Sequence, residues 1–270
     1  MSKNMKVVLI TGANRGIGFE ISRQLDEKGC QVILCSRDLK KGLNAASLLS
    51  QNAIVCRLDV TKEDSIRELV EFISVKFGKL DVLINNAGVG ANTQGNIILN
   101  NAKQIIKNKF QGTYNILKKV KPLFEKTKFL DKNIKVQNES LDTVKIVMET
   151  NFYGSWRMIN SFIPLLQKSN NGRIINISSG MGSLNNLSGL YPAYSLSKSS
   201  LNALTIMFSN ELKSSGINVN AVCPGWVRTD MGGPDAPLSV SEGADTAVWL
   251  AMNDEIPTGK FFQNRNIINW

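Results

Sequence analysis

Histidine is absent from the 270-residue sequence. This excludes the Ser-His-Asp and Cys-His arrangements of nucleophilic catalysis and most catalytic zinc sites, because all of them depend on imidazole. Acid–base chemistry near neutral pH must therefore use Tyr, Lys, Asp, Glu or Cys with a displaced pKa. Cysteine is also scarce, and the four thiols lack metal-ligand spacing: Cys30, Cys35, Cys56 and Cys223. We interpret them as reduced core residues and expect no metal site.

Long apolar runs are absent as well. No run approaches the roughly 20 residues that a membrane-spanning helix needs, and residues 1–6 lead almost directly into an apolar strand-like run, which leaves no room for a signal peptide. We therefore expect a cytoplasmic protein that does not enter a membrane. A chain that is 43% hydrophobic and 20% charged is typical of a globular protein, and its length suits one domain over residues 1–270.

Acidic residues are outnumbered, with a formal net charge of +10. Ten lysines and three acids between Gly90 and Ser140 account for +7 of that charge, so the basicity is local. A solvated helix surface is the plainer interpretation of such a run, and a surface for an acidic partner is the alternative. No recognised nucleic-acid motif accompanies the lysines, so we predict no nucleic-acid partner.

Strand-like and helical patterns alternate along the chain. Apolar runs typical of buried strands span 6–11, 31–36, 53–59, 80–85, 173–178 and 217–222, with a last edge strand predicted at 260–262. Helical patterns span 17–28, 41–50, 141–168 and 192–214, and N-cap pairs open two more, Thr61 with Asp64 for a helix to Phe77 and Ser239 with Glu242 for a helix to Met252. This alternation predicts an α/β fold, a Rossmann-type doubly wound parallel sheet flanked by helices, with its ligand site beyond the carboxyl ends of the strands.

Residues 90–140 interrupt this alternation. Roughly 50 residues separate the fourth strand from the next long helix, where a few are usual. Apolar residues recur at helical spacing from Ile105 to Val120, and Pro122 would end such a helix. We predict a helical insertion, whose role as a lid, a dimerisation element or mere decoration the sequence leaves open.

The first strand runs into a glycine-rich turn, Thr11 to Gly18, with glycines at positions 12, 16 and 18. Such a turn lets the backbone approach a pyrophosphate at the N-terminus of the following helix, although similar turns also occur for packing reasons. The second strand ends at Ser36 and Arg37, where NAD enzymes usually have an acid. Arg37 together with Arg15 suits a dianionic 2′-phosphate, whereas Asp38 is offset so as to point away. The pattern predicts NADP(H).

Tyr194 and Lys198 are four residues apart in a predicted helix, so their side chains share one face. A neighbouring ammonium lowers the pKa of a phenol, which is near 10 when free, and so makes the tyrosine a better acid–base group. Taken alone this spacing is common by chance on helix surfaces, and its companions decide its meaning.

The ordered motifs resemble those of the short-chain dehydrogenase/reductase family over nearly the whole chain except the insertion. The motifs are Gly12/Gly16/Gly18, Asn85-Asn86-Ala87-Gly88, Asn151, Ser178-Ser179, Tyr194-x-x-x-Lys198 and Pro224-Gly225. The pair Arg15 and Arg37, and the long insertion before Asn151, are similar to the monomeric NADPH-dependent carbonyl-reductase branch, which includes plant menthone and salutaridine reductase types.

The resemblance implies four catalytic roles. Tyr194 donates a proton to the substrate carbonyl as hydride arrives, Lys198 binds the nicotinamide ribose and depresses the tyrosine pKa, Ser179 orients the carbonyl oxygen, and Asn151 holds a water linked to Lys198. Ser179 is chosen over Ser178 because it lies 28 residues after Asn151. Asn85 and Ser178 could simply satisfy buried backbone groups.

The resemblance also implies the cofactor contacts. These are Gly12, Asn14, Arg15, Gly16, Ile17, Gly18, Ser36, Arg37, Asp59, Val60, Asn86, Ala87, Gly88, Tyr194, Lys198, Pro224, Gly225, Val227 and Thr229. Asp59 and Val60 would border the adenine, residues 86–88 would pack by the adenosine ribose, and the last four would contact the carboxamide and pyrophosphate.

The expected substrate wall consists, with Ser179, of Met181, Leu187, Tyr191, Trp226 and Met231. These residues are mostly apolar and favour a hydrophobic ketone, aldehyde or secondary alcohol, although each could serve packing alone. Only 15 residues separate Ser179 from Tyr194, so a second insertion often found in the carbonyl-reductase branch is missing. The pocket is therefore expected to be more open than in the plant enzymes.

Three other functions compete with a reductase. A regulatory or sensor protein that binds NADP(H) with little turnover would not need Asn151, Ser179, Tyr194 and Lys198 together. A nucleotide-sugar epimerase or dehydratase usually has a longer C-terminal substrate domain, and a nucleic-acid binder lacks its motif. The insertion lies just before the helix that commonly forms the dimer interface in this family, so a monomer is predicted. Substrate identity, reaction direction and stereochemistry do not follow from the sequence.

Overall fold

The structure, a computed structural model, describes residues 5–90 and 135–270. Its strands form one eight-stranded sheet in the order β3-β2-β1-β4-β5-β6-β7-β8. All neighbouring strands pair in parallel except β7 and β8. The strands are β1 (Val7–Ile10), β2 (Gln31–Ser36), β3 (Ile54–Arg57), β4 (Val82–Asn85), β5 (Arg173–Ile177), β6 (Asn218–Val222), β7 (Phe261–Gln263) and β8 (Asn266–Ile268).

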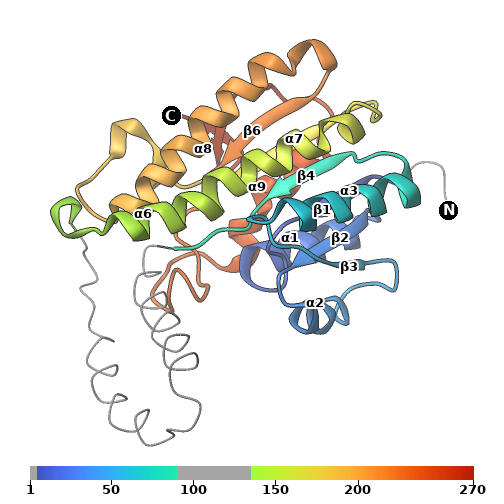
Figure 1. The fold of residues 1–270 in the computed structure, drawn as a ribbon, viewed down its shortest axis with the longest axis horizontal. Coiled ribbons are helices and arrows are strands. Elements are labelled where there is room, and N and C mark those ends of the chain that lie inside the picture. Colours follow the sequence, from blue (N-terminus) through green and yellow to red (C-terminus); the bar gives the residue numbers. More distant parts are fainter. Residues whose placement is uncertain (1–4, 91–134) are drawn as a thin grey trace, which may run out of the picture.

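Helices cover both faces of the sheet (Figure 1). The helices are α1 (Gly16–Glu27), α2 (Leu39–Ala46), α3 (Glu63–Phe77), α6 (Leu141–Met148), α7 (Gly154–Leu166), α8 (Pro192–Glu211) and α9 (Val240–Met252). One buried cluster joins α3, α7 and α8 to the sheet, and a second joins α1, α2 and α9 to the opposite face. The predicted doubly wound α/β fold is therefore confirmed.

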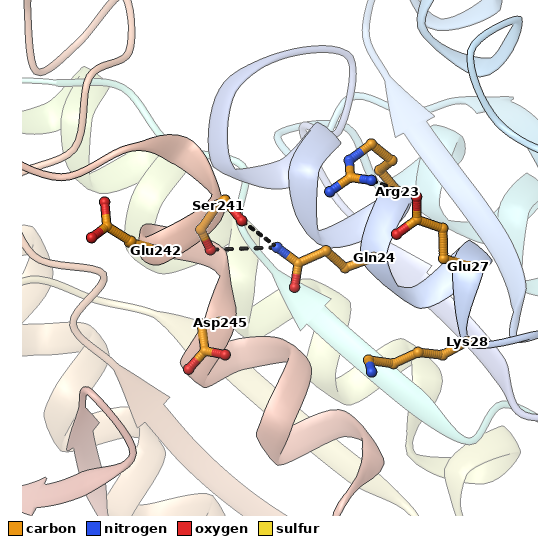
Figure 2. Close-up of a pocket in the computed structure, with 7 residues that line it drawn as sticks. All are labelled: Arg23, Gln24, Glu27, Lys28, Ser241, Glu242 and Asp245. Carbon is orange, nitrogen blue, oxygen red and sulfur yellow. Dashed lines mark hydrogen bonds and ion pairs between the residues drawn. The ribbon is translucent and has the colours of Figure 1, made fainter.

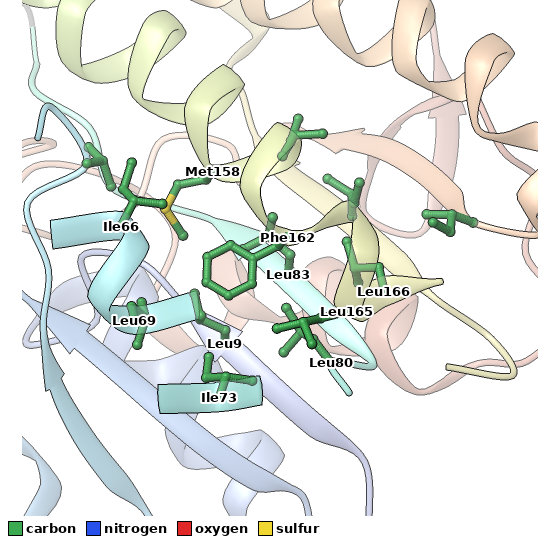
Figure 3. Close-up of a cluster of buried hydrophobic side chains, with 14 of the residues drawn as sticks. Leu9, Ile66, Leu69, Ile73, Leu80, Leu83, Met158, Phe162, Leu165 and Leu166 are labelled. Carbon is green, nitrogen blue, oxygen red and sulfur yellow. The ribbon is translucent and has the colours of Figure 1, made fainter. Parts of the chain in front are cut away.

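The first cluster shows how the sequence pattern produces the layers. Phe162 of α7 is fully buried and points between α3 and the sheet, among Leu9, Ile66, Leu83 and Met158 (Figure 3). Strand residues that are buried on both faces, as in the all-buried runs of β1, β2, β4 and β5, explain why these strands are continuously apolar.

The strand order reverses between β1 and β4, because the chain moves outward to β2 and β3 and then returns to β4. Ligands of open α/β sheets bind beyond the carboxyl ends of the strands at such a switch point. The loops that leave β1, β4, β5 and β6 therefore define the place to search for a site.

Four features of the fold differ notably from the sequence prediction. Helix α2 begins at Leu39 rather than residue 41, because Asp38 caps it. Lys62, not Thr61, is the N-cap of α3, since Thr61 instead binds Asp59. The long helix predicted at 141–168 contains a π-helical turn, Glu149–Tyr153, between α6 and α7. The last predicted strand is not at the edge, because β8 pairs with it in antiparallel fashion.

The capping box predicted for α9 is confirmed, with the Ser239 hydroxyl accepting from the Glu242 N–H and the Glu242 carboxylate accepting from the Ser239 N–H. Most of the predicted helical insertion, residues 91–134, lies outside the described residues. Within residues 5–90 and 135–270, no helix is long and apolar enough to cross a membrane.

Candidate active site

The glycine loop, residues 11–18, leaves β1 and is tied to the end of β4. The Thr11 hydroxyl accepts the N–H groups of Asn86 (3.0 Å) and Ala87 (2.9 Å). The Asn86 side-chain amide donates to the carbonyls of Thr11 (2.9 Å) and Gly12 (3.0 Å). A Cβ at Gly18 would lie 2.3 Å from the Asn86 Nδ2 atom, so only glycine leaves room for this contact. Asn86 thus holds the loop, and Thr11 joins the residues that sequence reasoning named.

The N-terminus of α1 offers free backbone donors to a ligand. Arg15 is its N-cap residue and makes no side-chain capping bond, and the first turn contains no acid. Asn14 and the first-turn residue Ile17 are partly buried, and Ile17 packs against the second core cluster. An uncapped, acid-free N-terminus next to a close-packed glycine loop fits a bound pyrophosphate.

Asp38 does not occupy the place where an acid would bind a ribose. Its carboxylate accepts the Lys41 N–H (3.1 Å) and so caps α2. The buried Ser36 hydroxyl donates to the Asp38 carbonyl (2.9 Å). Arg37, the residue between them, and Arg15 in the glycine loop are both exposed. The end of β2 therefore presents positive charge, as expected for a 2′-phosphate.

Asp59 and Val60 face inward more than the sequence prediction implied. The Asp59 Oδ1 atom accepts from the Thr61 N–H and hydroxyl, at 3.0 and 2.8 Å. Val60 is buried, and its Cγ2 atom lies 2.7 Å from where a Cβ on Gly154 would stand. The Asp59 N–H donates to the Ser65 hydroxyl and its carbonyl accepts the Lys62 N–H, so its second carboxylate oxygen is the group it could offer to an adenine.

Tyr194 and Lys198 lie on one face of α8, which begins with Pro192 at its first position. The Lys198 Nζ atom lies 5.6 Å from the centre of the Tyr194 ring and donates to the Ile177 carbonyl at the end of β5 (2.7 Å). Burial lowers the pKa of Lys198 to about 8. Burial also raises the pKa of Tyr194 to about 12, and a hydrogen bond with the Ser179 side chain partly offsets this. The sequence predicted a lowered tyrosine pKa, but in the structure desolvation is the larger effect.

The two adjacent serines have different surroundings. Ser179 accepts the Met181 N–H (3.2 Å) at the start of the 3₁₀ turn Gly180–Gly182, and its side chain contacts Tyr194. The buried Ser178 hydroxyl instead donates to the Asn202 Oδ1 atom (2.6 Å). Ser179 is therefore the one beside the phenol.

Asn151 lies in the π-helical turn and joins two parts of the site. Its amide donates to the Val89 carbonyl (3.1 Å) and the Ser197 hydroxyl (3.0 Å), while its Oδ1 atom accepts the Val89 N–H (2.8 Å). A Cβ at Gly88, just before Val89, would lie 3.3 Å from this oxygen, which is a tight contact. π-Helical turns often occur at functional sites. Asn151 connects the segment after β4 to α8, and the water that the resemblance assigns to it stays a prediction.

The β6 loop, residues 223–238, follows β6 and contacts the glycine loop. Gly225 has a φ of +79°, and a Cβ there would lie 2.5 Å from the Leu238 side chain. Val227 is buried against Gly243, so it can offer only its backbone to a ligand. A methyl at Gly16 would lie 3.4 Å from the Thr229 Cγ2 atom, which places Thr229 over the glycine loop.

The predicted substrate wall is open among the described residues. Leu187, Trp226 and Met231 are 44%, 57% and 53% exposed, whereas Met181 and Tyr191 are partly buried. Met231 nevertheless lies against Gly90, and the Trp226 Nε1 atom donates to the Gly232 carbonyl (2.8 Å). Three of these five side chains are therefore accessible to a ligand.

A hollow of about 500 Å³ lies between α1 and α9, away from Tyr194 and Lys198 on α8 (Figure 2). Several of its charged side chains are already paired, since Arg23 binds Glu20 and Glu27, and Asp245 binds Arg265. Gln24 donates to the Ser241 carbonyl and hydroxyl across the hollow (Figure 2). No acid–base pair comparable to Tyr194 and Lys198 lines it, so the surroundings of Tyr194 are the better candidate site.

Three residues of the site were missed by sequence reasoning, besides Thr11. They are Asn202, Cys223 and Asp230, which contact Ser178, Gly180 and Arg15 respectively. Asn202 follows Lys198 by four residues, so the helical spacing that found Tyr194 and Lys198 could have found it too. The other two come from the β6 loop, whose path no periodicity predicts.

Comparison with known proteins agrees with this arrangement. The model of the short chain dehydrogenase family matches residues 6–129 and 130–237. The chain is 33% identical to (+)-neomenthol dehydrogenase of Arabidopsis thaliana over 97% of each chain. It is 31% identical to carbonyl reductase [NADPH] 1 of Mus musculus over the whole of both chains. The NADPH-bound carbonyl reductase from chicken fatty liver superposes with a TM-score of 0.76 at 26% identity, covering 99% of this chain and 100% of that one.

Proposed function

The chain belongs to the short-chain dehydrogenase family, and on that premise we propose that it reduces the carbonyl group of a hydrophobic ketone or aldehyde with NADPH, or oxidises the matching alcohol. The observation that carries this proposal is the contact of Ser179 and Lys198 with Tyr194 beyond the carboxyl end of β5, the strand next to β4. Here a partly buried phenol, a buried amine and a hydroxyl come together beyond the carboxyl end of β5.

The residues that follow β1 and β2 fit NADP(H). The glycine loop and the uncapped N-terminus of α1 would hold the pyrophosphate. Arg37 and Arg15 would bind the 2′-phosphate, which Asp38 does not oppose because it caps α2. The carbonyl reductase of mouse carries NADPH in its name, and the chicken enzyme was solved with NADPH bound. These observations together support NADP(H) rather than NAD(H).

The proposed mechanism assigns one task to each polar group. When bound, NADPH supplies the hydride that reduces the carbonyl carbon. Tyr194 gives its phenolic proton to the carbonyl oxygen, and the Ser179 hydroxyl donates a hydrogen bond that orients this oxygen. Lys198, charged below about pH 8, stabilises the phenolate that remains. Asn151 keeps α8 in register with the segment after β4 through Val89 and Ser197.

The apolar residues of the predicted substrate wall indicate the class of substrate. Met181, Leu187, Tyr191, Trp226 and Met231 would contact a hydrophobic body next to the carbonyl, with Ser179 on its oxygen. Two plant relatives are named (+)-neomenthol dehydrogenase and (−)-isopiperitenone reductase, and these names are compatible with this class. Burying this apolar surface against a substrate would contribute roughly 25 cal/mol for each Å².

The experiment that tests the proposal separates it from a sensor function. NADPH fluorescence measures cofactor binding, and oxidation of NADPH by a generic carbonyl measures turnover. Binding together with turnover is the result expected of a reductase. Binding without turnover on any carbonyl would instead favour a sensor that holds NADP(H).

We also infer a single domain and a monomeric protein. The single sheet formed by the eight strands supports a single domain. The insertion precedes α6 and α7, the region in which related chains commonly pair. Light scattering is expected to give a mass near 29.7 kDa, and twice that mass would contradict the monomer.

A further inference from the structure

The serine loop, residues 178–183, is hydrogen-bonded near both of its ends to one side chain of α8, that of Asn202. Ser178 donates to the Asn202 Oδ1 atom (2.6 Å), and the Asn202 Nδ2 atom donates to the Gly182 carbonyl (3.1 Å). Both Asn202 and Ser178 are buried, with exposed fractions of 4% and 2%. One donor and one acceptor of the same amide therefore hold the residues that flank the turn containing Ser179.

Asn202 lies on the helix that carries the reacting groups. It follows Lys198 by four residues and Tyr194 by eight, so the three side chains share one face of α8. The loop also touches this helix directly, because a Cβ on Gly182 would lie 2.7 Å from the Lys198 carbonyl carbon. A shift of Asn202 would therefore change the position of the serine loop relative to Tyr194.

The other hydrogen bonds that side chains make with this turn join it to residues outside α8. The Cys223 thiol accepts the Gly180 N–H (3.1 Å), and the Ser183 hydroxyl donates to the Trp270 carbonyl (2.8 Å). The Ser179 hydroxyl belongs to none of these fastenings, since it caps the Met181 N–H and contacts Tyr194. Asn202 is thus the group that links this hydroxyl's loop to the phenol's helix by side-chain bonds at both ends.

We propose that Asn202 is a positioning residue that sets the placement of Ser179 against Tyr194. The inference rests on the proposed function for its catalytic consequence, and on the structure alone for the order of the loop. An amide suits the task because Ser178 needs an acceptor and the Gly182 carbonyl needs a donor. Removing it takes the side-chain donor from the buried Gly182 carbonyl and leaves the Ser178 hydroxyl with only a long bond to the Lys198 carbonyl (3.5 Å).

The first experiment measures the order of the loop without any turnover. Amide hydrogen exchange over residues 180–183 is compared among wild type, Asn202→Ala and Thr205→Val. Thr205 is a matched control, because it lies on the same helix and accepts a buried bond from the Asn176 amide (2.9 Å) but has no hydrogen bond to the serine loop. We expect exchange at 180–183 to become about tenfold faster in Asn202→Ala and to stay unchanged in Thr205→Val. Unchanged exchange in Asn202→Ala would overturn the proposal.

The second experiment is a double-mutant cycle with Ser179→Ala. Asn202→Ala should lower kcat about tenfold or more while the Kd for NADPH changes less than twofold. If Asn202 acts through Ser179, the double variant will be no slower than Ser179→Ala alone. Losses that multiply in the double variant would mean that Asn202 acts elsewhere and would overturn the proposal.

A near-isosteric variant covers the case in which Asn202→Ala does not fold. Asn202→Asp keeps the acceptor for Ser178 and, when ionised, removes the donor to Gly182, so the same loosening at 180–183 is expected. A wild type that binds NADPH but reduces no carbonyl would defeat the proposed function only. The exchange measurement would still decide the role of Asn202.

Discussion

The Arg15 Nη1 atom lies 2.5 Å from the Asp230 Oδ2 atom, which joins the glycine loop to the β6 loop by an ion pair. Both side chains are largely exposed, at 70% and 73%. Arg15 is also one of the two guanidinium groups that suit a 2′-phosphate. The carboxylate and the phosphate would therefore compete for the same cation.

This competition gives a prediction with a definite sign. Asp230→Asn should strengthen NADPH binding about two- to fivefold, because an exposed ion pair is worth at most about 1 kcal/mol. NADH lacks the 2′-phosphate, so its binding should stay unchanged. Fluorescence titration at low salt measures both affinities. Asp235→Asn, an equal charge change in the same loop, serves as control, and weaker NADPH binding in Asp230→Asn would contradict the competition.

Arg37 provides the second test of the cofactor assignment. Its exposed guanidinium follows the buried Ser36 at the end of β2. Arg37→Ala should weaken NADPH binding about 10- to 100-fold, since charge-assisted bonds to a phosphate are lost, and should leave NADH binding nearly unchanged. Arg67→Ala on α3 makes the same charge change at another exposed position. Equal losses for NADPH and NADH would sink the assignment of Arg37 to the 2′-phosphate.

Lys198 connects stability to pH. Its native pKa is about 8, below the ordinary value of 10.5, because burial disfavours the ammonium. Between these two values the unfolded chain binds more protons than the native state, so stability rises with pH across this window. Below about pH 8 the full cost of burying the charge applies. Each pKa unit corresponds to about 1.4 kcal/mol.

Lys198→Met should therefore stabilise the protein by about 2 kcal/mol at pH 7, after allowance for the lost bond to Ile177. The advantage should shrink as the pH rises toward 10. Urea unfolding at several pH values up to about 10 measures it. Lys213→Met removes an exposed amine as a control. A variant that is less stable than wild type at pH 7 would show that burial of the Lys198 amine does not limit stability.

Much of the fold follows from local patterns in the sequence. The runs of β1 and β2 are continuously apolar because these strands are buried on both faces, and such runs are visible without a structure. The box of Ser239 and Glu242 is equally local and is confirmed. Tyr194 and Lys198 come together because helical spacing fixes them, whereas their pKa shifts depend on burial that no local pattern reports.

Contacts between distant segments account for what the sequence did not predict. Asp230 meets Arg15 across 215 positions of chain, and Cys223 meets Gly180 across 43. Such partners depend on the path of loops, which hydrophobic periodicity does not encode. The π-helical turn at Asn151 also escaped prediction, because its residues continue the apolar spacing of an ordinary helix on either side.

The most direct measurement of the account is NADPH oxidation, followed at 340 nm, against a panel of aldehydes, quinones and cyclic ketones. Tyr194→Phe is assayed beside wild type, with NADPH affinity measured for both. We predict turnover by wild type and a loss of about 10²- to 10⁴-fold in the variant, with cofactor binding preserved, because the proton donor alone is removed. Turnover that persists undiminished in Tyr194→Phe would contradict the assignment of Tyr194 as the acid–base group.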